Sequence, residues 1–257
     1  MRSIWSGAIA FGLVNIPVKI FSATQQSELD LDMLDKKDLS NIRFKRVNES
    51  TGKEVPYENI VRAYNLDGQY VVLTDEDYKK ASPEKSKLIE IAEFVEEKEI
   101  DSIYYEIPYY LEPQKSGVKA YALLRDALKK TGKSGIATFV MRTKESLALV
   151  KPMGDLLILQ KIRYAEEIRD SEEVNIPKAD NKPAELKMAI SLIDQLTTKF
   201  DISKYRDTYS DDLMKLIKAK AKGKKIPEPS MRVVHSKTED LMAQLKASLD
   251  NKKKKAS

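Results

Sequence analysis

The 257-residue sequence predicts an α+β fold that is mainly β: a closed or nearly closed barrel, followed by helices and a basic tail. Two observations favour this fold class. Short apolar segments, separated by turn residues at close intervals, fill the first two-thirds of the chain, which is typical of barrels. In the last third the apolar residues change to helical spacing, and a run of lysines follows.

The strands of the predicted barrel begin near the N-terminus. Residues 7–22 are apolar on both faces and predict one well-buried strand, in which Pro17 requires an edge, a bulge or a bend. Residues 65–68 predict a hairpin turn, and Thr74 caps a short helical turn after that hairpin. The remaining strands are expected at residues 42–47, 58–64, 69–73, 88–95, 102–111, 136–143, 147–150 and 156–164.

Three longer helices are expected, and each has a start or a stop signal. Ser116 precedes the first helix, which Gly132 ends. Pro183 fits the first turn of the second helix, and the third covers residues 204–222 and stops at Gly223. In the first helix, the face expected to pack on a core carries Val118, Tyr121, Leu124 and Leu128. In the second helix it carries Leu186, Ile190, Ile193, Leu196 and Phe200. In the third helix it carries Tyr209, Leu213, Leu216 and Ile217.

Positive charge is concentrated at the C-terminal end of the sequence. Residues 211–257 contain thirteen Lys/Arg and six Asp/Glu, a balance of +7, whereas residues 1–210 contain thirty-two basic and thirty-four acidic groups, a balance of −2. This asymmetry favours a polyanion as partner, DNA or RNA before a membrane. A tail that only keeps the protein soluble is the alternative interpretation.

The sequence lacks the combinations of residues that usually carry out catalysis. The chain has no cysteine, which excludes disulfides and thiolate metal sites, and its one histidine, His235, provides neither a catalytic triad nor a metal cluster. Residues 132–134 resemble a phosphate-binding loop, but Ala127 stands where that loop needs a glycine. The carboxylates lie in polar turns beside lysines, which disfavours a metal-dependent nuclease. We therefore expect a protein that is not an enzyme and needs no metal or cofactor.

No apolar run reaches the roughly 20 residues that span a bilayer, and the N-terminus lacks the pattern of a secretion signal. The sequence therefore predicts a cytoplasmic protein without membrane contact. Binding to a polyanion such as DNA would associate this protein with the nucleoid.

Two groups of cations are candidates for contacts with phosphates. The C-terminal group comprises Lys215, Lys218, Lys220, Lys222, Lys224 and Lys225, in eleven residues without an acid, and also Lys252, Lys253, Lys254 and Lys255. The second group comprises Arg43, Lys45, Arg46, Lys53 and Arg62. Lysine suits phosphate as a point charge and does not discriminate base edges, so the expected binding is independent of sequence.

A short amphipathic helix is expected close to the C-terminus. Ser236 and Glu239 have the spacing of a capping box ahead of an apolar stripe. The stripe needs a partner or packs back on the core, and its residues are Leu241, Met242, Leu245 and Leu249.

Several motifs resemble the bacterial Ku proteins. The opening segment, residues 4–18 (IWSGAIAFGLVNIPV), is closely similar to the start of that family. The similarity continues in collinear order over roughly residues 1–225, through residues 42–47, 54–57, 70–77, 108–113, 119–125, 163–169 and 204–207.

The resemblance implies a homodimer whose β-barrel cores and interlocked arms form a ring around the end of double-stranded DNA. It implies that the ring recruits and stimulates a multifunctional, ATP-dependent DNA ligase in non-homologous end joining, and that the family has no catalytic residues. By position, it places the cations between Arg43 and Arg62 in the arm and bridge around DNA. Leu241, Met242 and Leu245 are then candidate contacts with the ligase.

The resemblance also predicts how the chain is organised. Residues 1–200 would form the barrel core and the DNA-encircling bridge, 201–229 a basic helical region, and 230–257 a flexible lysine-rich tail. Histidines that many relatives carry at residues 31–35 are absent, as are paired cysteines near residues 48 and 51, so no metal role is transferred. Two alternatives stay open: an architectural protein of the nucleoid, or a protein–protein adaptor without selectivity for DNA ends.

Overall fold

The computed structural model describes residues 1–81, 87–141, 144–224 and Leu245. Contacts within the chain divide it into two units, one made of residues 1–26 and 30–170, the other of residues 27–29 and 171–257. The boundaries expected at residues 200 and 229 are defined by function and not by contacts within the chain. They stay a prediction.

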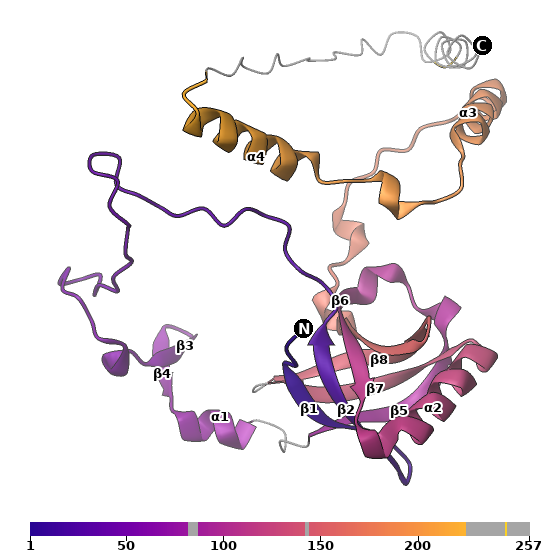
Figure 1. The fold of residues 1–257 in the computed structure, drawn as a ribbon, viewed down its shortest axis with the longest axis horizontal. Coiled ribbons are helices and arrows are strands. Elements are labelled where there is room, and N and C mark those ends of the chain that lie inside the picture. The colour runs from indigo at the N-terminus through magenta and orange to yellow at the C-terminus, as the bar shows by residue number, and fades with distance from the viewer. Residues whose placement is uncertain (82–86, 142–143, 225–244, 246–257) are drawn as a thin grey trace. The chain divides into compact units, whose positions relative to one another are not determined.

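The first unit contains a closed barrel of seven strands, as the sequence predicts (Figure 1). Around the barrel the order is β1-β2-β6-β9-β8-β7-β5, and every pair is antiparallel except β1 with β5, which is parallel. The strands are β1 (Trp5–Phe11), β2 (Val14–Ser22), β5 (Leu88–Glu96), β6 (Tyr105–Pro113), β7 (Lys133–Met141), β8 (Lys144–Met153) and β9 (Leu156–Ile162).

The single strand predicted over residues 7–22 is wrong, because this segment is the β1–β2 hairpin. Phe11 pairs with Val14, and Gly12 adopts a φ of 55°, which glycine tolerates best. Pro17 pairs with Ala8 in β1 and lies just before the ladder that joins β2 to β6. Its missing N–H therefore breaks no hydrogen bond of that second ladder.

The barrel interior is the hydrophobic core of the first unit. Residues on alternate positions of the strands point inward, and many of them have no exposed surface. Burying each such side chain stabilises the fold by about 1.5–3 kcal/mol. The fully buried residues of this kind include Ile9, Ile16, Ile20, Ile89, Leu111, Val150, Leu157 and Leu159.

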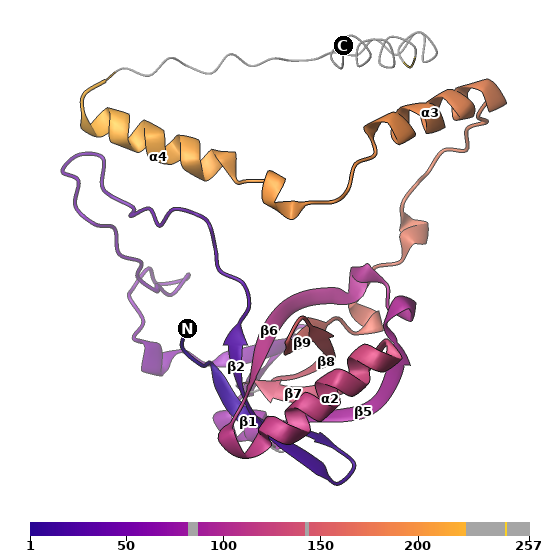
Figure 2. The same cartoon turned by 45° about the vertical axis from the view of Figure 1, so that its right-hand side comes forward.

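Helix α2 (Val118–Thr131) packs against the barrel and contacts β2, β7 and β8 (Figure 2). Tyr121, Leu124 and Leu128 are buried in the core, as predicted, whereas Val118 from the same expected face is mostly exposed. Gly132 ends the helix with a φ of 67°.

The hydroxyl of Tyr121 links α2 to two strands. It donates a hydrogen bond to the Leu111 carbonyl and accepts one from the Leu157 N–H, both at 2.6 Å. Burial raises the pKa of Tyr121 above its ordinary value. The phenol therefore stays neutral and keeps its donor at neutral pH.

Residues 30–81, which we call the arm, carry no buried residue. They contain β3 (Arg62–Leu66), β4 (Gln69–Leu73) and α1 (Asp75–Ala81). The predicted hairpin is confirmed, with Asp67 and Gly68 at positive φ in its turn. The predicted cap of α1 is also present, because the Thr74 hydroxyl and the Asp77 backbone N–H lie 3.3 Å apart.

The strand predicted over residues 42–47 is wrong. The structure has only isolated bridges there, between Leu34 and Asn41 and between Val47 and Glu54. Phe44, at the centre of the segment, is 80% exposed. A strand needs a partner along its length and a core under its apolar face, and the described part of the arm provides neither.

The second unit contains α3 (Pro183–Leu196) and α4 (Thr208–Ala221). Pro183 lies in the first turn of α3, as predicted. Asp207 caps α4 by accepting a hydrogen bond from the Ser210 N–H, so this helix starts later than the predicted Lys204. No described residue between 171 and 224 is buried, so the core expected under the apolar faces of both helices is not formed within this unit.

The remaining helical turns are short. They are η1 (Tyr57–Asn59), η2 (Glu97–Glu99), η3 (Ser102–Tyr104), η4 (Lys115–Gly117), η5 (Ala165–Glu167), η6 (Ser171–Glu173) and η7 (Ile202–Lys204). Because η3 occupies the start of the strand predicted at 102–111, β6 begins only at Tyr105.

Candidate nucleic-acid interface

A tight turn in the arm holds three of the predicted cations close together in the chain. The Val55 N–H donates to the Arg46 carbonyl, and the Asn48 N–H donates to the Lys53 carbonyl, both at 2.8 Å. Within the turn, Gly52 adopts a φ of 63°, which glycine tolerates best. This geometry places Lys45, Arg46 and Lys53 on one exposed loop.

Lys45 is not a free cation on this loop. Its Nζ lies 2.6 Å from a carboxylate oxygen of Glu54, and both side chains are mainly exposed. The hydrogen bond that Lys45 donates to Glu54, and the negative charge of that carboxylate, raise the pKa of Lys45 above the ordinary value. Lys45 therefore stays protonated, but Glu54 competes with any phosphate that approaches it.

Two arginines of the arm are held over tyrosine rings. The guanidinium carbon of Arg46 lies 5.2 Å from the centre of the Tyr57 ring, and that of Arg62 lies 5.9 Å from the Tyr78 ring. Stacking of this kind restricts the guanidinium while leaving its N–H groups at the edge free to meet an acceptor. Such pre-orientation suits arginine for contacts with phosphate.

Three of these four residues border a hollow in the arm, from which Arg46 is absent. A cavity of about 400 Å³ is lined by Tyr57, Arg62 and Tyr78 together with residues of β4 and the start of α1. Both tyrosines were absent from the predicted site, because each is eleven or more residues away from its arginine along the chain. The only signal in the sequence was the family motif at residues 54–57, which contains Tyr57.

Arg43 and Lys53 are exposed and belong to the same arm. The predicted strand that would have put Arg43 and Lys45 on one face does not form, so their common face stays a prediction. Arg62 lies in β3 and belongs to the hollow with Tyr78, rather than to the loop that carries Arg46.

The described lysines of the C-terminal group belong to the second unit and lie on or just after α4 (Thr208–Ala221). Lys215 pairs with Asp212 at 2.7 Å, whereas Lys218 and Lys220 occupy the last turn, where positive charge favours the helix. Lys222 is the C-cap, and the Lys224 N–H donates to the Ala219 carbonyl. All five of these lysines are exposed.

Several predicted site residues lie outside the described residues. They are Lys225, Leu241, Met242, Lys252, Lys253, Lys254 and Lys255. Leu245 is described and helical.

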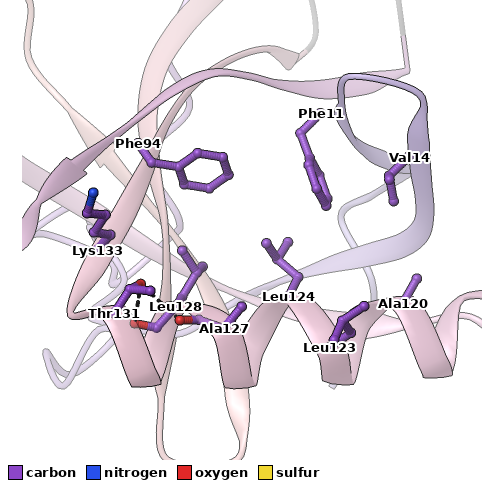
Figure 3. Close-up of a pocket in the computed structure, with 10 residues that line it drawn as sticks. All are labelled: Phe11, Val14, Phe94, Ala120, Leu123, Leu124, Ala127, Leu128, Thr131 and Lys133. Carbon is purple, nitrogen blue, oxygen red and sulfur yellow. Dashed lines mark hydrogen bonds between the residues drawn. The ribbon is translucent and has the colours of Figure 1, made fainter.

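A cleft of different character lies between α2 and the tip of the β1–β2 hairpin (Figure 3). It measures about 510 Å³, and its walls include Phe11, Phe94 and Leu123. Among the described residues, Lys133 is the one charged residue that borders it. A surface of this composition does not suit contacts with phosphates, which need several donors.

Acidic residues do not gather into a metal site in the part of the chain that the structure describes. The described helices also include none that is long and apolar enough to cross a membrane.

Both regions outside the barrel expose large apolar side chains. In the arm, Phe44 and Tyr70 are among them, and in the second unit Ile193 and Phe200. Apolar surface of this extent on a folded chain marks a surface that another molecule covers.

The sequence matches proteins of one family. The family profile described as the Ku70/Ku80 beta-barrel domain matches residues 10–188. The Non-homologous end joining protein Ku of Coxiella burnetii is 39% identical over an alignment that covers 98% of this chain and 96% of that protein. The proteins of the same name from Bacillus subtilis and Mycobacterium tuberculosis are 39% and 38% identical, covering 97% and 99% of this chain and 82% and 97% of their own lengths.

Proposed function

The chain belongs to the Ku family, and from that premise we propose that two copies form a ring that binds the ends of double-stranded DNA in non-homologous end joining. The ring contacts the DNA backbone and does not read the base sequence. The protein catalyses no reaction itself and needs no cofactor.

One observation carries this proposal: the arm exposes apolar side chains and cations together. Phe44 and Tyr70 need a protein surface to cover them, and Arg46 and Arg62 are oriented for an anion. A second copy of the chain, related by two-fold symmetry, covers the same surface on both copies at once. The cations that stay exposed then face the DNA.

Selectivity for ends follows from closure of the ring. A flat basic surface binds linear and closed circular DNA equally well, because the phosphates are the same. A closed ring has to be threaded from an end. Lysines of α4 and of the tail would add DNA affinity that depends on salt. This binding would associate the protein with the nucleoid.

We further propose that the bound ring recruits an ATP-dependent, multifunctional DNA ligase. Leu241, Met242 and Leu245 are the candidate contacts, because their apolar spacing fits one face of a helix. The ligase supplies the chemistry that this chain lacks.

The test is a gel-shift titration with linear, nicked and closed circular duplexes of one sequence, at two salt concentrations, together with the mass of the protein in solution. We expect a dimer that binds linear DNA and leaves closed circles unbound. A monomer, or equal binding of closed circles, contradicts the ring and favours an architectural protein. Absence of any salt-dependent DNA binding favours an adaptor.

A further inference from the structure

The two ends of the barrel differ. Helix α2 covers the end where β9 begins, since Tyr121 bonds to the Leu157 N–H there. At the opposite end, where β7 finishes and β8 starts, the barrel opens into a cavity of about 460 Å³. This volume falls within the roughly 300–1,000 Å³ of small-molecule sites, which often occupy the mouths of barrels.

Ser146 places an unused hydroxyl in this cavity. The residue is only 7% exposed and pairs with Phe139 of β7, so both side chains point to the barrel interior. Among the described residues, no hydrogen bond of the Ser146 hydroxyl exists, although it lines the cavity. The hydroxyl is not one of the fully buried, unpartnered polar atoms of the described residues, so it is accessible from the cavity. A polar group in the cavity can therefore form a hydrogen bond with it.

Three aromatic residues border the same cavity, namely Phe139, Trp5 and Tyr109. Trp5 is fixed, because its indole N–H donates to the Val140 carbonyl at 3.1 Å and its ring lies over Gly7. A Cβ on Gly7 would come within 2.2 Å of that ring, so only glycine permits the arrangement. Tyr109 from β6 borders the cavity too and packs on the core. These rings offer flat apolar surfaces without further reorganisation.

The charges at the mouth are balanced. Lys161 lies 2.8 Å from Glu106, and Lys144 lies 4.0 Å from Glu167. Because each ammonium has a carboxylate beside it, the site has no excess of positive charge to attract a bare phosphate. It offers donors and acceptors around an aromatic and apolar interior, which matches a neutral ring with polar edges.

We propose that this open end of the barrel binds a nucleobase. The ring stacks against Trp5 or Tyr109, as bases do on aromatic side chains, and a polar edge bonds to the Ser146 hydroxyl. The base belongs either to a free nucleotide or to an unpaired nucleotide at a DNA end. This site goes beyond the proposed function, since it binds a base whether or not the protein forms a ring.

Trp5 is the only tryptophan of the chain, so its fluorescence reports on this cavity alone. The first experiment titrates the full-length protein with deoxyadenosine, with deoxyadenosine monophosphate and with inorganic phosphate. We expect both compounds that carry a base to change the emission with saturation at millimolar concentration or below, and phosphate to leave it unchanged. An unchanged emission with the nucleoside, or an equal response to phosphate, overturns the proposal.

Ser146→Ala separates binding from folding. It removes a hydroxyl that reaches the cavity and has no hydrogen-bond partner among the described residues, so we expect little change in unfolding by urea and roughly two- to ten-fold weaker binding of deoxyadenosine, as for the loss of one hydrogen bond. The matched control is Ser134→Ala, another buried serine of the barrel, which bonds to Glu97 away from the cavity. Binding by Ser146→Ala that equals that of the wild type contradicts the assignment.

A second series compares blunt duplexes with duplexes that carry a 3′ or a 5′ single-stranded end. If the base comes from a DNA end, only the duplexes with an unpaired end change the Trp5 emission, at concentrations far below those of the free nucleoside. If the base comes from a nucleotide, the duplexes behave alike. Gel shifts of the same samples report end binding separately, so failure of the cavity and failure of the proposed ring are distinguishable.

Discussion

The barrel and the arm of the first unit use their apolar residues in different ways. In the barrel every strand has two neighbours, and side chains such as Ile9 and Leu159 are fully buried. In the arm, the β3–β4 hairpin stands as a two-stranded sheet, and Leu66 and Tyr70 on it are exposed. The barrel is therefore stabilised by its own contacts, whereas an isolated hairpin is marginal in water. Under the proposed function, the arm gains its stability from the second copy.

The largest effect that this comparison predicts is on unfolding. Leu149→Ala removes a side chain with no exposed surface from the barrel, and we expect a loss of about 2–5 kcal/mol in the free energy of unfolding. Leu66→Ala shortens an exposed side chain in the arm, and we expect its unfolding at low protein concentration to change by less than about 0.5 kcal/mol. Urea titrations of both variants measure this. Equal losses would mean that the arm packs on the barrel and that the comparison is wrong.

The next largest effect concerns the two hydrogen bonds that join Tyr121 of α2 to the barrel. Tyr121→Phe keeps the ring but leaves the Leu111 carbonyl and the Leu157 N–H without their partner. Because both groups are buried, we expect a loss of about 2 kcal/mol in the free energy of unfolding. Tyr70→Phe in the arm, where the residue is 71% exposed, is the matched control and should change little. A loss as large in the control would refute the distinction between the two regions.

Periodicity predicted the barrel well, because its strands are short and its core is local to it. The apolar segments of the sequence predicted β8 and β9, and the stop of α2 at Gly132 was also predicted. The β1–β2 hairpin was missed, since apolar residues continue on both sides of Gly12 and conceal the turn. Predicting this turn from the sequence requires treating Gly12 as a residue that can adopt a positive φ.

The candidate interface was harder to predict than the fold. The cations between Arg43 and Arg62 could be named from composition and family motif, but their partners could not. Tyr57 reaches Arg46 only because the turn at Gly52 reverses the chain, and Tyr78 reaches Arg62 only because α1 follows β4. The strand expected at residues 42–47 failed for a related reason, since no described residue of the chain covers its apolar face.

We expect cations of the arm to contribute more to DNA affinity than cations of the barrel. Arg46→Gln removes an exposed guanidinium that Tyr57 orients, and we expect the slope of log affinity against log salt to fall by roughly 0.9, with weaker binding of linear duplex. Lys98→Gln removes one positive charge from η2 of the barrel and is the matched control. Arg46→Lys, which keeps the charge but loses the planar group, should restore the slope more than the affinity. A slope that changes equally in both charge-removing variants would contradict a specific contact in the arm.

The smallest predicted effect has the opposite sign and tests whether Lys45 belongs to the interface. Glu54→Gln removes the carboxylate that lies 2.6 Å from Lys45, so the pKa of Lys45 falls back toward its ordinary value. That value, about 10.4, still leaves the lysine protonated at neutral pH. The freed ammonium can then neutralise a phosphate, and one carboxylate no longer repels DNA. We expect a few-fold tighter binding of linear duplex and a salt slope steeper by up to about 0.9. If the gain passes through Lys45, the double variant Lys45→Gln/Glu54→Gln loses the steeper slope, whereas repulsion by Glu54 alone would leave the tighter binding in place.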